Sequence, residues 1–515
     1  MAIDNVRDRK DPTAEQRKKE GARSAGAGPF ICKFKSFMGL PYIYDVNTNE
    51  MVQVDKVVYD ILDDITLNND DIVNKWRRWH DEDSVRKSIG EIREALDQGY
   101  FLSIPKVSMS PPACEGCLED LMEGESCKLI LNLTEDCNLR CVYCAFTGSY
   151  AHNRVHSDRV MDIGLGERAI SRAFELAQKS SKASISFYGG EPFLYFDRIV
   201  HLIDHAKRIG TGIEELEFHI DTNGTILDRE MREYLIRNKI YIQISLDGPK
   251  EVHDRYRVFR GGTGTFDTIM RNLEMLRSEN EEYYQYHVGF ASTVTPPYRL
   301  PDVDGFFERG EFESNVVMVT FVDPYDTTFF DSHCTEQEKS NLGEQIESLR
   351  RHYMRERTRG ETPSKLARGL FDSSMIRLHK RGRTPLGNVF PSNGICIPGI
   401  RRFFVDTDGG IYPCERVGTA FKLGTVHGGV ERGRVFGLID EYIERSWNDC
   451  ASCWAMRLCG ICFAGFRKQQ GFDIERKREN CTYELDRLRQ ALRTYVTILD
   501  ENEHSLDFVE DLKIT

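Results

Sequence analysis

The middle of the chain alternates between short apolar stretches and longer stretches with helical spacing. Six stretches read as strands, and they cover residues 128–133, 183–187, 217–220, 240–246, 287–294 and 316–322. Helical patterns, such as residues 166–177, lie between them. This alternation predicts a parallel sheet with helices outside. We therefore expect an α/β fold over 129–330, curled into a partial (β/α)6 barrel whose functional groups gather at the C-terminal strand ends.

A smaller α+β pattern precedes the barrel, over residues 29–105. Strands are expected at 30–35, 42–46, 51–54 and 100–104, with helices at about 55–64, 70–80 and 84–98. This order resembles the winged-helix peptide-recognition element of enzymes that modify ribosomally made peptides. Such elements bind a leader peptide as an added edge strand. No single residue carries the resemblance, so a generic winged-helix or dimerisation domain stays open.

The other segments are interpreted from composition. Residues 1–28 are charged and small, without apolar periodicity, and are expected to be disordered. Residues 106–128 form a linker in which Cys114, Cys117 and Cys127 either join a metal site or are idle thiols. Residues 331–390 are polar, helical in parts and interpreted as a linker. Residues 391–482 are dense in cysteine, and residues 483–515 comprise an amphipathic helix and an acidic tail.

Length and charge restrict the class of protein. A chain of 515 residues exceeds what one hydrophobic core usually serves. We find no apolar run long enough for a membrane span and no apolar export signal at the N-terminus. Fifteen cysteines without such a signal indicate a reducing, cytoplasmic setting and metal ligation. The net charge of −13 argues against a nucleic-acid partner.

Three cysteines follow the first barrel strand with the spacing C-x3-C-x2-C, at Cys137, Cys141 and Cys144. Thiolates this close cannot all pair as disulfides, but they can face one iron–sulfur cluster. Three ligands on a four-iron cube leave one iron open to a small molecule, as in a catalytic metal site. A structural zinc site or incidental cysteines are the alternatives.

The second barrel strand ends in Gly189-Gly190-Glu191-Pro192. Two glycines let the backbone approach a ligand closely, and the Glu191 carboxylate beside them can receive an ammonium group. Alone, this motif would be a turn with a capping glutamate. Here it follows the cysteine loop by one β–α unit, which is the place to meet the same ligand.

Together these motifs resemble the radical S-adenosylmethionine (radical SAM) family. The resemblance implies that the open iron of a 4Fe–4S cluster binds SAM and that reduction releases a 5′-deoxyadenosyl radical, which abstracts a hydrogen atom from the substrate. It also implies further SAM contacts, which are Tyr143 near the adenine, Thr222 and Asn223 in a Thr-Asn-Gly turn, Ser245 and Arg257 at the SAM carboxylate, and Val322 packed on the adenine. A planar guanidinium suits a carboxylate ligand. Without the flanking motifs, Ser245 and Arg257 would be read as a strand-end cap and a surface ion pair.

Seven later cysteines form a second pattern, Cys396-x12-Gly409-x4-Cys414, Cys450-x2-Cys453-x5-Cys459-x2-Cys462 and Cys481. The pattern resembles the SPASM extension of radical SAM peptide maturases, which holds two auxiliary 4Fe–4S clusters. That extension usually has x3 where this chain has x2, so the loop before Cys462 is expected to differ. A zinc ribbon is the alternative.

The resemblance divides these cysteines into two ligand sets. Cys450, Cys453, Cys459 and Cys481 would hold an outer cluster, and Cys396, Cys414 and Cys462 an inner one. Relatives with full ligation have a fourth inner ligand shortly before the first cysteine, but residues 386–395 contain none. The inner cluster therefore has an open iron or borrows Cys114, Cys117, Cys127 or Cys334. An open iron would let a substrate cysteine coordinate and attack a nearby carbon radical to form a thioether.

Glu415 directly follows Cys414. Relatives that form formylglycine carry an acidic proton acceptor at this place, so Glu415 is the candidate catalytic residue. The alternative is a carboxylate that faces solvent.

The sequence thus predicts a radical SAM peptide maturase with three 4Fe–4S clusters and SAM. We expect it to bind a ribosomal precursor peptide through its leader, to draw electrons from a flavodoxin- or ferredoxin-type reductant, and to install a crosslink, most simply a Cys thioether. Carbon–carbon crosslinking and formylglycine formation, as in anaerobic sulfatase maturation, are the near alternatives. A non-catalytic iron–sulfur electron carrier is the remote one.

Overall fold

Ten strands form one sheet that runs from the barrel into the C-terminal region. The computed structural model describes residues 28–104, 108–110, 127–151, 153–176, 182–324, 326–391, 396, 398, 402–468, 471–510 and 512. In this part of the chain the order of strands is β10-β9-β8-β7-β6-β5-β12-β13-β14-β15. The strands β5 to β10 are parallel, which confirms the parallel α/β prediction.

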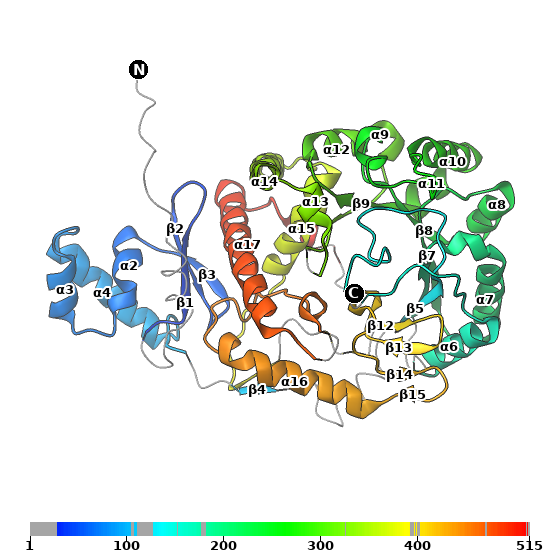
Figure 1. Cartoon of the computed structure of the whole chain (residues 1–515). Helices are drawn as coiled ribbons and strands as arrows, with labels where there is room; N and C mark the ends of the chain where they lie inside the picture. The colour runs from blue at the N-terminus through cyan, green and yellow to red at the C-terminus, as the bar shows by residue number, and fades with distance from the viewer. Residues whose placement is uncertain are drawn as a thin grey trace, which may run out of the picture.

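The barrel strands lie where the apolar stretches predicted them. They are β5 (Cys127–Thr134), β6 (Lys182–Gly189), β7 (Glu215–Thr222), β8 (Tyr241–Ser245), β9 (Val288–Val294) and β10 (Val317–Phe321). Their outer faces bury residues such as Phe187, Ile220 and Phe290. The helices that cover them are α6 (Ile163–Leu176), α7 (Phe196–Ile209), α8 (Arg229–Asn238), α9 (Lys250–His253), α10 (Phe266–Glu279), α11 (Glu281–His287) and α12 (Leu300–Phe307), as Figure 1 shows.

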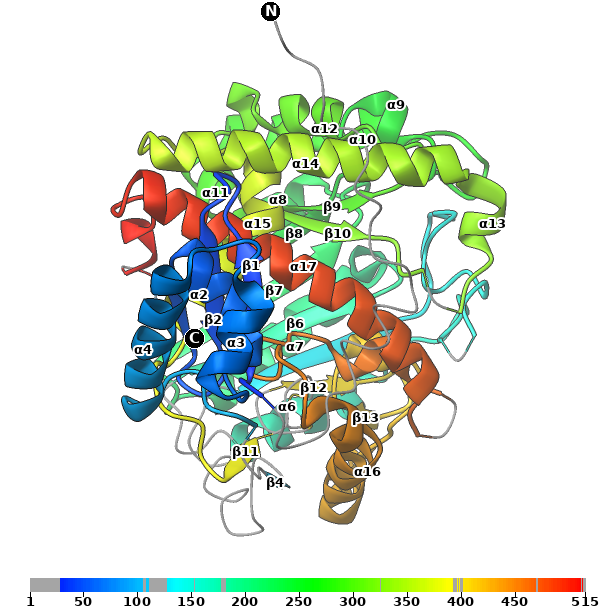
Figure 2. The same cartoon turned by 90° about the vertical axis from the view of Figure 1, so that its left-hand side faces the viewer.

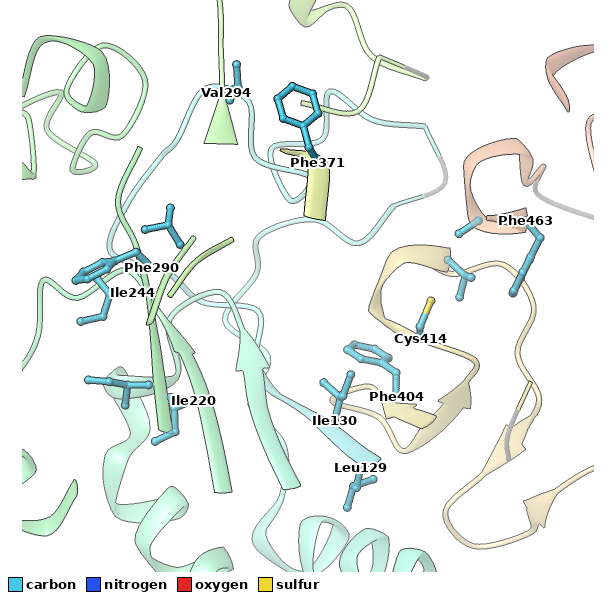
Figure 3. Packing of buried hydrophobic residues seen from close by; sticks show 14 of the residues in the cluster. Leu129, Ile130, Ile220, Ile244, Phe290, Val294, Phe371, Phe404, Cys414 and Phe463 are labelled. Carbon is cyan, nitrogen blue, oxygen red and sulfur yellow. The ribbon is translucent and has the colours of Figure 1, made fainter. Parts of the chain in front are cut away.

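A strand from the C-terminal region extends the barrel sheet, which the sequence did not predict. Strand β12 (Arg402–Val405) pairs in parallel with β5, with Phe404 opposite Ile130. Strands β13 (Gly410–Tyr412), β14 (Gly424–Thr425) and β15 (Gly429–Val430) continue it in antiparallel fashion. Figure 3 shows Phe404 beside Ile130 and Leu129, with Cys414 close by. Cys414, which follows β13, is therefore held near the first barrel strand.

The segment 331–390 differs from the expected linker because it consists of packed helices. It contains α14 (Glu336–Thr358) and α15 (Lys365–His379), which follow the short α13 (Phe329–His333). Tyr353 and Met375 are buried in the main core. Figure 2 shows α14 lying across the top of the molecule. The segment ends in β11 (Val389–Pro391), which pairs with β4 (Ser108–Ser110).

The C-terminal region is built on two long helices, α16 (Arg432–Cys450) and α17 (Ile474–Glu501). The second contains the amphipathic helix expected at 483–500. It packs against the N-terminal sheet and against α14 and α15. Short 3₁₀ turns at Glu415–Val417 and Phe463–Phe466 follow Cys414 and Cys462.

The N-terminal module has a three-stranded antiparallel sheet and three helices. The strands are β1 (Ile31–Lys35), β2 (Pro41–Asp45) and β3 (Glu50–Gln53), and the helices are α2 (Lys56–Ile61), α3 (Asn69–Trp76) and α4 (Glu82–Asp97). The expected final strand at 100–104 is only an isolated bridge between Pro29 and Ser103. Phe101 has a φ of 56° and its N–H donates to Asp45, so the chain turns there. The expected disordered residues 1–27 and most of the linker at 106–128 lie outside the described residues.

Candidate active site

The cysteine loop follows β5 and is held by a second loop. Cys137 and Cys141 are buried, and Cys144 is partly buried. The backbone N–H groups of Arg140 and Val142 donate to the carbonyls of Val258 and Tyr256, at 2.8 and 3.0 Å. Burial raises the pKa of the Cys141 thiol to about 12. Such a thiol keeps its proton at neutral pH unless a metal displaces it, so three converging buried thiols fit a cluster as their partner.

The two glycines approach the cysteine loop more closely than any side chain would allow. A Cβ on Gly189 would lie 2.2 Å from the Thr134 carbonyl oxygen, and one on Gly190 would lie 2.1 Å from that of Asp136. The N–H of Gly190 donates to the Thr134 carbonyl at 2.8 Å. We expected these glycines to let the backbone approach a ligand. They also let it pack directly against the backbone that leads to Cys137.

Glu191 differs from the expected ammonium receptor. Its side chain is fully buried and does not line the cavity described below. The carboxylate accepts from the Thr222 hydroxyl at 2.7 Å, from the Asn223 N–H at 2.7 Å and from the Phe193 N–H at 3.0 Å. Burial raises its pKa to about 7 although these donors oppose the shift. Glu191 thus joins the glycine motif to the Thr-Asn-Gly turn, and Pro192 is buried beside it.

Asp247, for which the sequence analysis predicted no role, is the centre of the next cluster. It accepts from Arg257 Nε at 3.0 Å, from the Tyr143 hydroxyl at 2.5 Å and from the Thr293 N–H at 3.1 Å. The Arg257 guanidinium lies 5.4 Å from the centre of the Tyr143 ring. Burial opposes the charge of Arg257, but Asp247, Tyr143 and Cys141 together raise the pKa of the guanidinium. Asp247 lies within the Ser245–Pro249 motif, and this position was the only feature of the sequence that could have indicated its role.

One cavity of about 760 Å³ extends from the cysteine loop to Cys462. Most of the predicted SAM contacts line it, namely Tyr143, Gly189, Gly190, Thr222, Asn223, Ser245, Arg257 and Val322, together with Cys137, Cys141 and Cys144. Val322 is buried next to Tyr143, Tyr256 and Phe329. Glu415 and Cys462 also line the cavity. The volume of the cavity suits a bound cofactor with a substrate segment beside it.

Glu415 faces this cavity. One of its carboxylate oxygens is buried without a hydrogen-bond partner among the described residues, and Arg402 Nη1 lies 3.7 Å from the other. Asp221, at the end of β7, lines the same cavity. Burial raises the pKa of Asp221 to about 6, and the nearby Glu415 charge adds to the shift while Lys128 opposes it. The raised pKa of Asp221 therefore gives the site a carboxyl group that can exchange a proton near neutral pH.

The inner cysteines lie near one another around the end of the β12–β13 hairpin. Burial raises the pKa of the Cys414 thiol to about 12, and negative charge on Glu415, Cys462 and Cys396 adds to this shift. Cys334 lies elsewhere, with its Sγ 3.8 Å from the Tyr298 hydroxyl. Cys114, Cys117, residues 392–395 and the Cys127 side chain lie outside the described residues, so the fourth inner ligand stays a prediction.

The outer cysteines come from the end of α16, the loop after it and the first half of α17. Burial raises the pKa of the Cys453 thiol to about 12, and negative charge on Cys450, Cys459 and Cys481 adds to it. Lys477 Nζ donates to Cys450 Sγ at 3.3 Å. No three His, Cys, Asp or Glu side chains in the described ranges are arranged to hold a single metal ion. None of the described helices combines the length and the apolar character that a membrane crossing needs.

Comparison with known proteins agrees with this geometry. Residues 131–290 match the Radical SAM superfamily. A cysteine-type anaerobic sulfatase-maturating enzyme of Clostridium novyi is 26% identical over 348 residues, which is 66% of this chain and 88% of that protein. A serine-type anaerobic sulfatase-maturating enzyme of Bacteroides thetaiotaomicron is 28% identical over 151 residues, which is 28% of this chain and 35% of that protein. Residues 131–290 thus form a radical SAM domain, and the chain is homologous to anaerobic sulfatase-maturating enzymes over about two thirds of its length.

A solved structure shows the same fold. Native anSMEcpe with bound AdoMet and Kp18Cys peptide has a TM-score of 0.55 and 19% identity, and the likeness covers 75% of this chain and all of that one. Radical SAM membership implies a 4Fe–4S cluster and SAM, which the cysteine loop and cavity fit.

Proposed function

We propose that this chain is a radical SAM peptide maturase that oxidises a cysteine or serine side chain of a peptide to an aldehyde, the reaction of formylglycine formation. The observation that carries the proposal is the single cavity that both the Cys137 loop and Glu415 line. A peptide side chain in this cavity would meet a radical source and a proton acceptor at once. The relatives named for sulfatase maturation support this product over the thioether.

The residues have separate roles in this proposal. Cys137, Cys141 and Cys144 hold the cluster, while Asn223, Ser245 and Arg257 bind SAM. When bound, the cluster and SAM supply a 5′-deoxyadenosyl radical that takes a hydrogen atom from the substrate. Asp247 orients Arg257 and Tyr143 through the contacts described above.

Glu415 receives the proton in this reaction. A substrate cysteine would lose a Cβ hydrogen atom to the radical and its thiol proton to Glu415, which leaves a carbon–sulfur double bond once one electron is removed. The auxiliary clusters that the seven C-terminal cysteines would hold would supply the acceptor for that electron. Water then replaces the sulfur, hydrogen sulfide leaves, and the aldehyde remains. One buried oxygen of Glu415 has no hydrogen-bond partner among the described residues, so it is available to accept a proton, which suits a base.

A Cys thioether is the second candidate product. The observation that favours it is the inner site, where only Cys396, Cys414 and Cys462 are brought together among the described residues. An inner cluster with an open iron would bind a substrate thiolate beside the cavity. The two products differ in sulfur, because a thioether retains it and an aldehyde made from cysteine loses it.

The N-terminal module would present the peptide. Among the described residues β3 has a strand neighbour on one side only, and an unpaired edge is a template for an added strand. Val54 N–H donates to the Pro41 carbonyl, and the antiparallel alternation then directs the N–H groups of Met51 and Gln53 to the open edge. We also propose a cytoplasmic setting and a flavodoxin- or ferredoxin-type reductant.

The reaction class is tested with anaerobically reconstituted protein, SAM and a strong reductant. We expect release of 5′-deoxyadenosine, and its loss in Cys141→Ala. Absence of release from the wild-type protein with a full cluster would refute the enzyme proposal. With a peptide that contains one cysteine, Glu415→Gln should still release 5′-deoxyadenosine but form aldehyde roughly 10²–10⁴-fold more slowly. The surface variant Glu431→Gln is the control. A product that retains sulfur and lacks two hydrogen atoms would favour the thioether.

Leader binding has its own test. Gln53→Pro removes one N–H from the open edge but no β2–β3 hydrogen bond, whereas Gln53→Ala keeps the N–H and serves as the matched control. We expect weaker binding of a fluorescent precursor leader to Gln53→Pro alone. Equal affinity of both variants would exclude edge-strand addition at β3.

A further inference from the structure

Lys477 is a buried lysine whose position the proposed reaction does not explain. It lies in the first turns of α17, four residues before Cys481, and its exposed fraction is 2%. Its Nζ donates to Cys450 Sγ at 3.3 Å. No carboxylate forms an ion pair with it in the described part of the chain, although lysines such as Lys468 pair with aspartate.

A buried ammonium without a counter-charge is costly, because removal from water is not offset. The groups near Lys477 are thiols, those of Cys450, Cys481 and Cys459. As neutral thiols they would offer no negative charge. As thiolates on a cluster they would form an anion, whose net negative charge increases on reduction.

We propose that Lys477 is a positioning residue that acts as the buried counter-ion of the outer iron–sulfur cluster and raises its reduction potential. The inference rests on the proposed ligand set Cys450, Cys453, Cys459 and Cys481. A fixed positive charge at a ligating sulfur stabilises the reduced cluster more than the oxidised one, since the reduced form carries more negative charge. The outer cluster then becomes a better acceptor for the electron that leaves the substrate.

The placement of Lys477 supports this role over a purely packing one. The ammonium comes from the same helix as Cys481 but reaches Cys450 at the end of α16, so its charge lies between two ligands from different elements. A hydrogen bond from a charged donor to a ligating sulfur is among the main means by which proteins shift cluster potentials.

The test compares Lys477→Met, Lys477→Arg and Lys468→Met in reconstituted full-length protein. Lys477→Met removes the charge at similar length, Lys477→Arg retains it, and Lys468→Met removes an exposed lysine that is 56% accessible in its side chain. The readouts are iron content and an EPR-monitored redox titration, with the outer signal assigned by its loss in Cys453→Ser. We expect the outer potential to become more negative in Lys477→Met and to stay near wild type in the other two.

Each other outcome has a defined meaning. Loss of the outer cluster in Lys477→Met with retention in Lys477→Arg supports the need for the charge. An unchanged potential in a fully loaded Lys477→Met, or equal cluster loss in both Lys477 variants, overturns the inference. A wild-type protein without an outer signal overturns the proposed cofactor set, and this inference with it.

Discussion

Asp221 is a barrel side chain whose burial raises its pKa and makes its charged form unfavourable. Strand β7 buries Phe218 and Ile220 on its outer face and turns Asp221 toward the cavity. The carboxylate has no hydrogen-bond partner among the described residues, unlike Glu191, which has three donors. Burial therefore raises the pKa of Asp221 to about 6, and the Glu415 charge increases the shift.

This shift predicts how stability depends on pH. A buried carboxyl group whose pKa is raised in the folded state does not lower the free energy of unfolding while it is protonated. The wild type therefore loses stability as the pH rises from about 4 through 6, because the carboxyl group then becomes charged. Asp221→Asn should thus be more stable than wild type by about 2 kcal/mol at pH 8, with a gain that shrinks as the pH falls below 6. Anaerobic denaturant unfolding at several pH values measures it. The exposed Asp158→Asn is the control, and a pH-independent gain would contradict the assignment.

At the scale of elements, the cysteine loop is fixed from two sides. The glycine motif after β6 lies against its first half, and residues 256–260 pair with its second half. Arg260 Nε donates to the Cys137 carbonyl at 2.9 Å. The loop thus holds its three thiols through backbone contacts with neighbouring strand ends rather than through its own sequence.

Gly190→Ala tests this dependence. The new Cβ would lie 2.1 Å from the Asp136 oxygen and 3.1 Å from Cys137 Cβ, so the loop must shift. We expect a loss of about 1–3 kcal/mol in unfolding free energy and a lower iron content after reconstitution, measured with 5′-deoxyadenosine release. Gly212→Ala, where a Cβ meets nothing within 4 Å, should match wild type. Full iron content in Gly190→Ala would show that the loop tolerates displacement.

What could be predicted from the sequence follows the range of the interactions. The barrel strands and the cysteine loop are local patterns, so their positions agreed with the structure. The pairing of β12 with β5 joins residues far apart in the chain, and nothing local indicates it. Residues 331–390 were interpreted as a linker with helical parts because α14 is strongly polar along most of its length, and it buries only Leu349, Tyr353 and Met354 among its apolar side chains. Asp247 and Lys477 acquire roles only once distant groups surround them.

At the scale of the whole molecule, the N-terminal module is packed onto the outer-cluster region. One face of its sheet packs on α2 to α4, and the other reaches α17, where the Phe37 N–H donates to the Thr497 hydroxyl at 2.9 Å. Tyr44 is fully buried and lies edge-on to Trp454, with ring centres 6.4 Å apart. Trp454 follows Cys453 directly. A peptide paired with β3 would therefore lie next to β2, the strand whose Tyr44 contacts Trp454 beside the proposed ligand Cys453.

Arg457 is the main polar link across this boundary. Its Nη1 donates to the carbonyls of Val46, Asn47 and Thr384, at 3.2, 3.0 and 2.8 Å. Arg457→Met keeps much of the apolar stem but leaves these acceptors without a charged donor, a loss of about 2 kcal/mol. We expect the loop that carries Cys453 and Cys459 to open more often, so that a chelator removes outer-cluster iron faster while iron at the Cys137 loop stays unaffected. Arg434→Met on the surface of α16 is the control. Equal rates of iron removal in both variants would show that the N-terminal module does not affect the outer cluster. Faster iron loss in Arg457→Met, slowed by added leader peptide, would establish that the two are coupled.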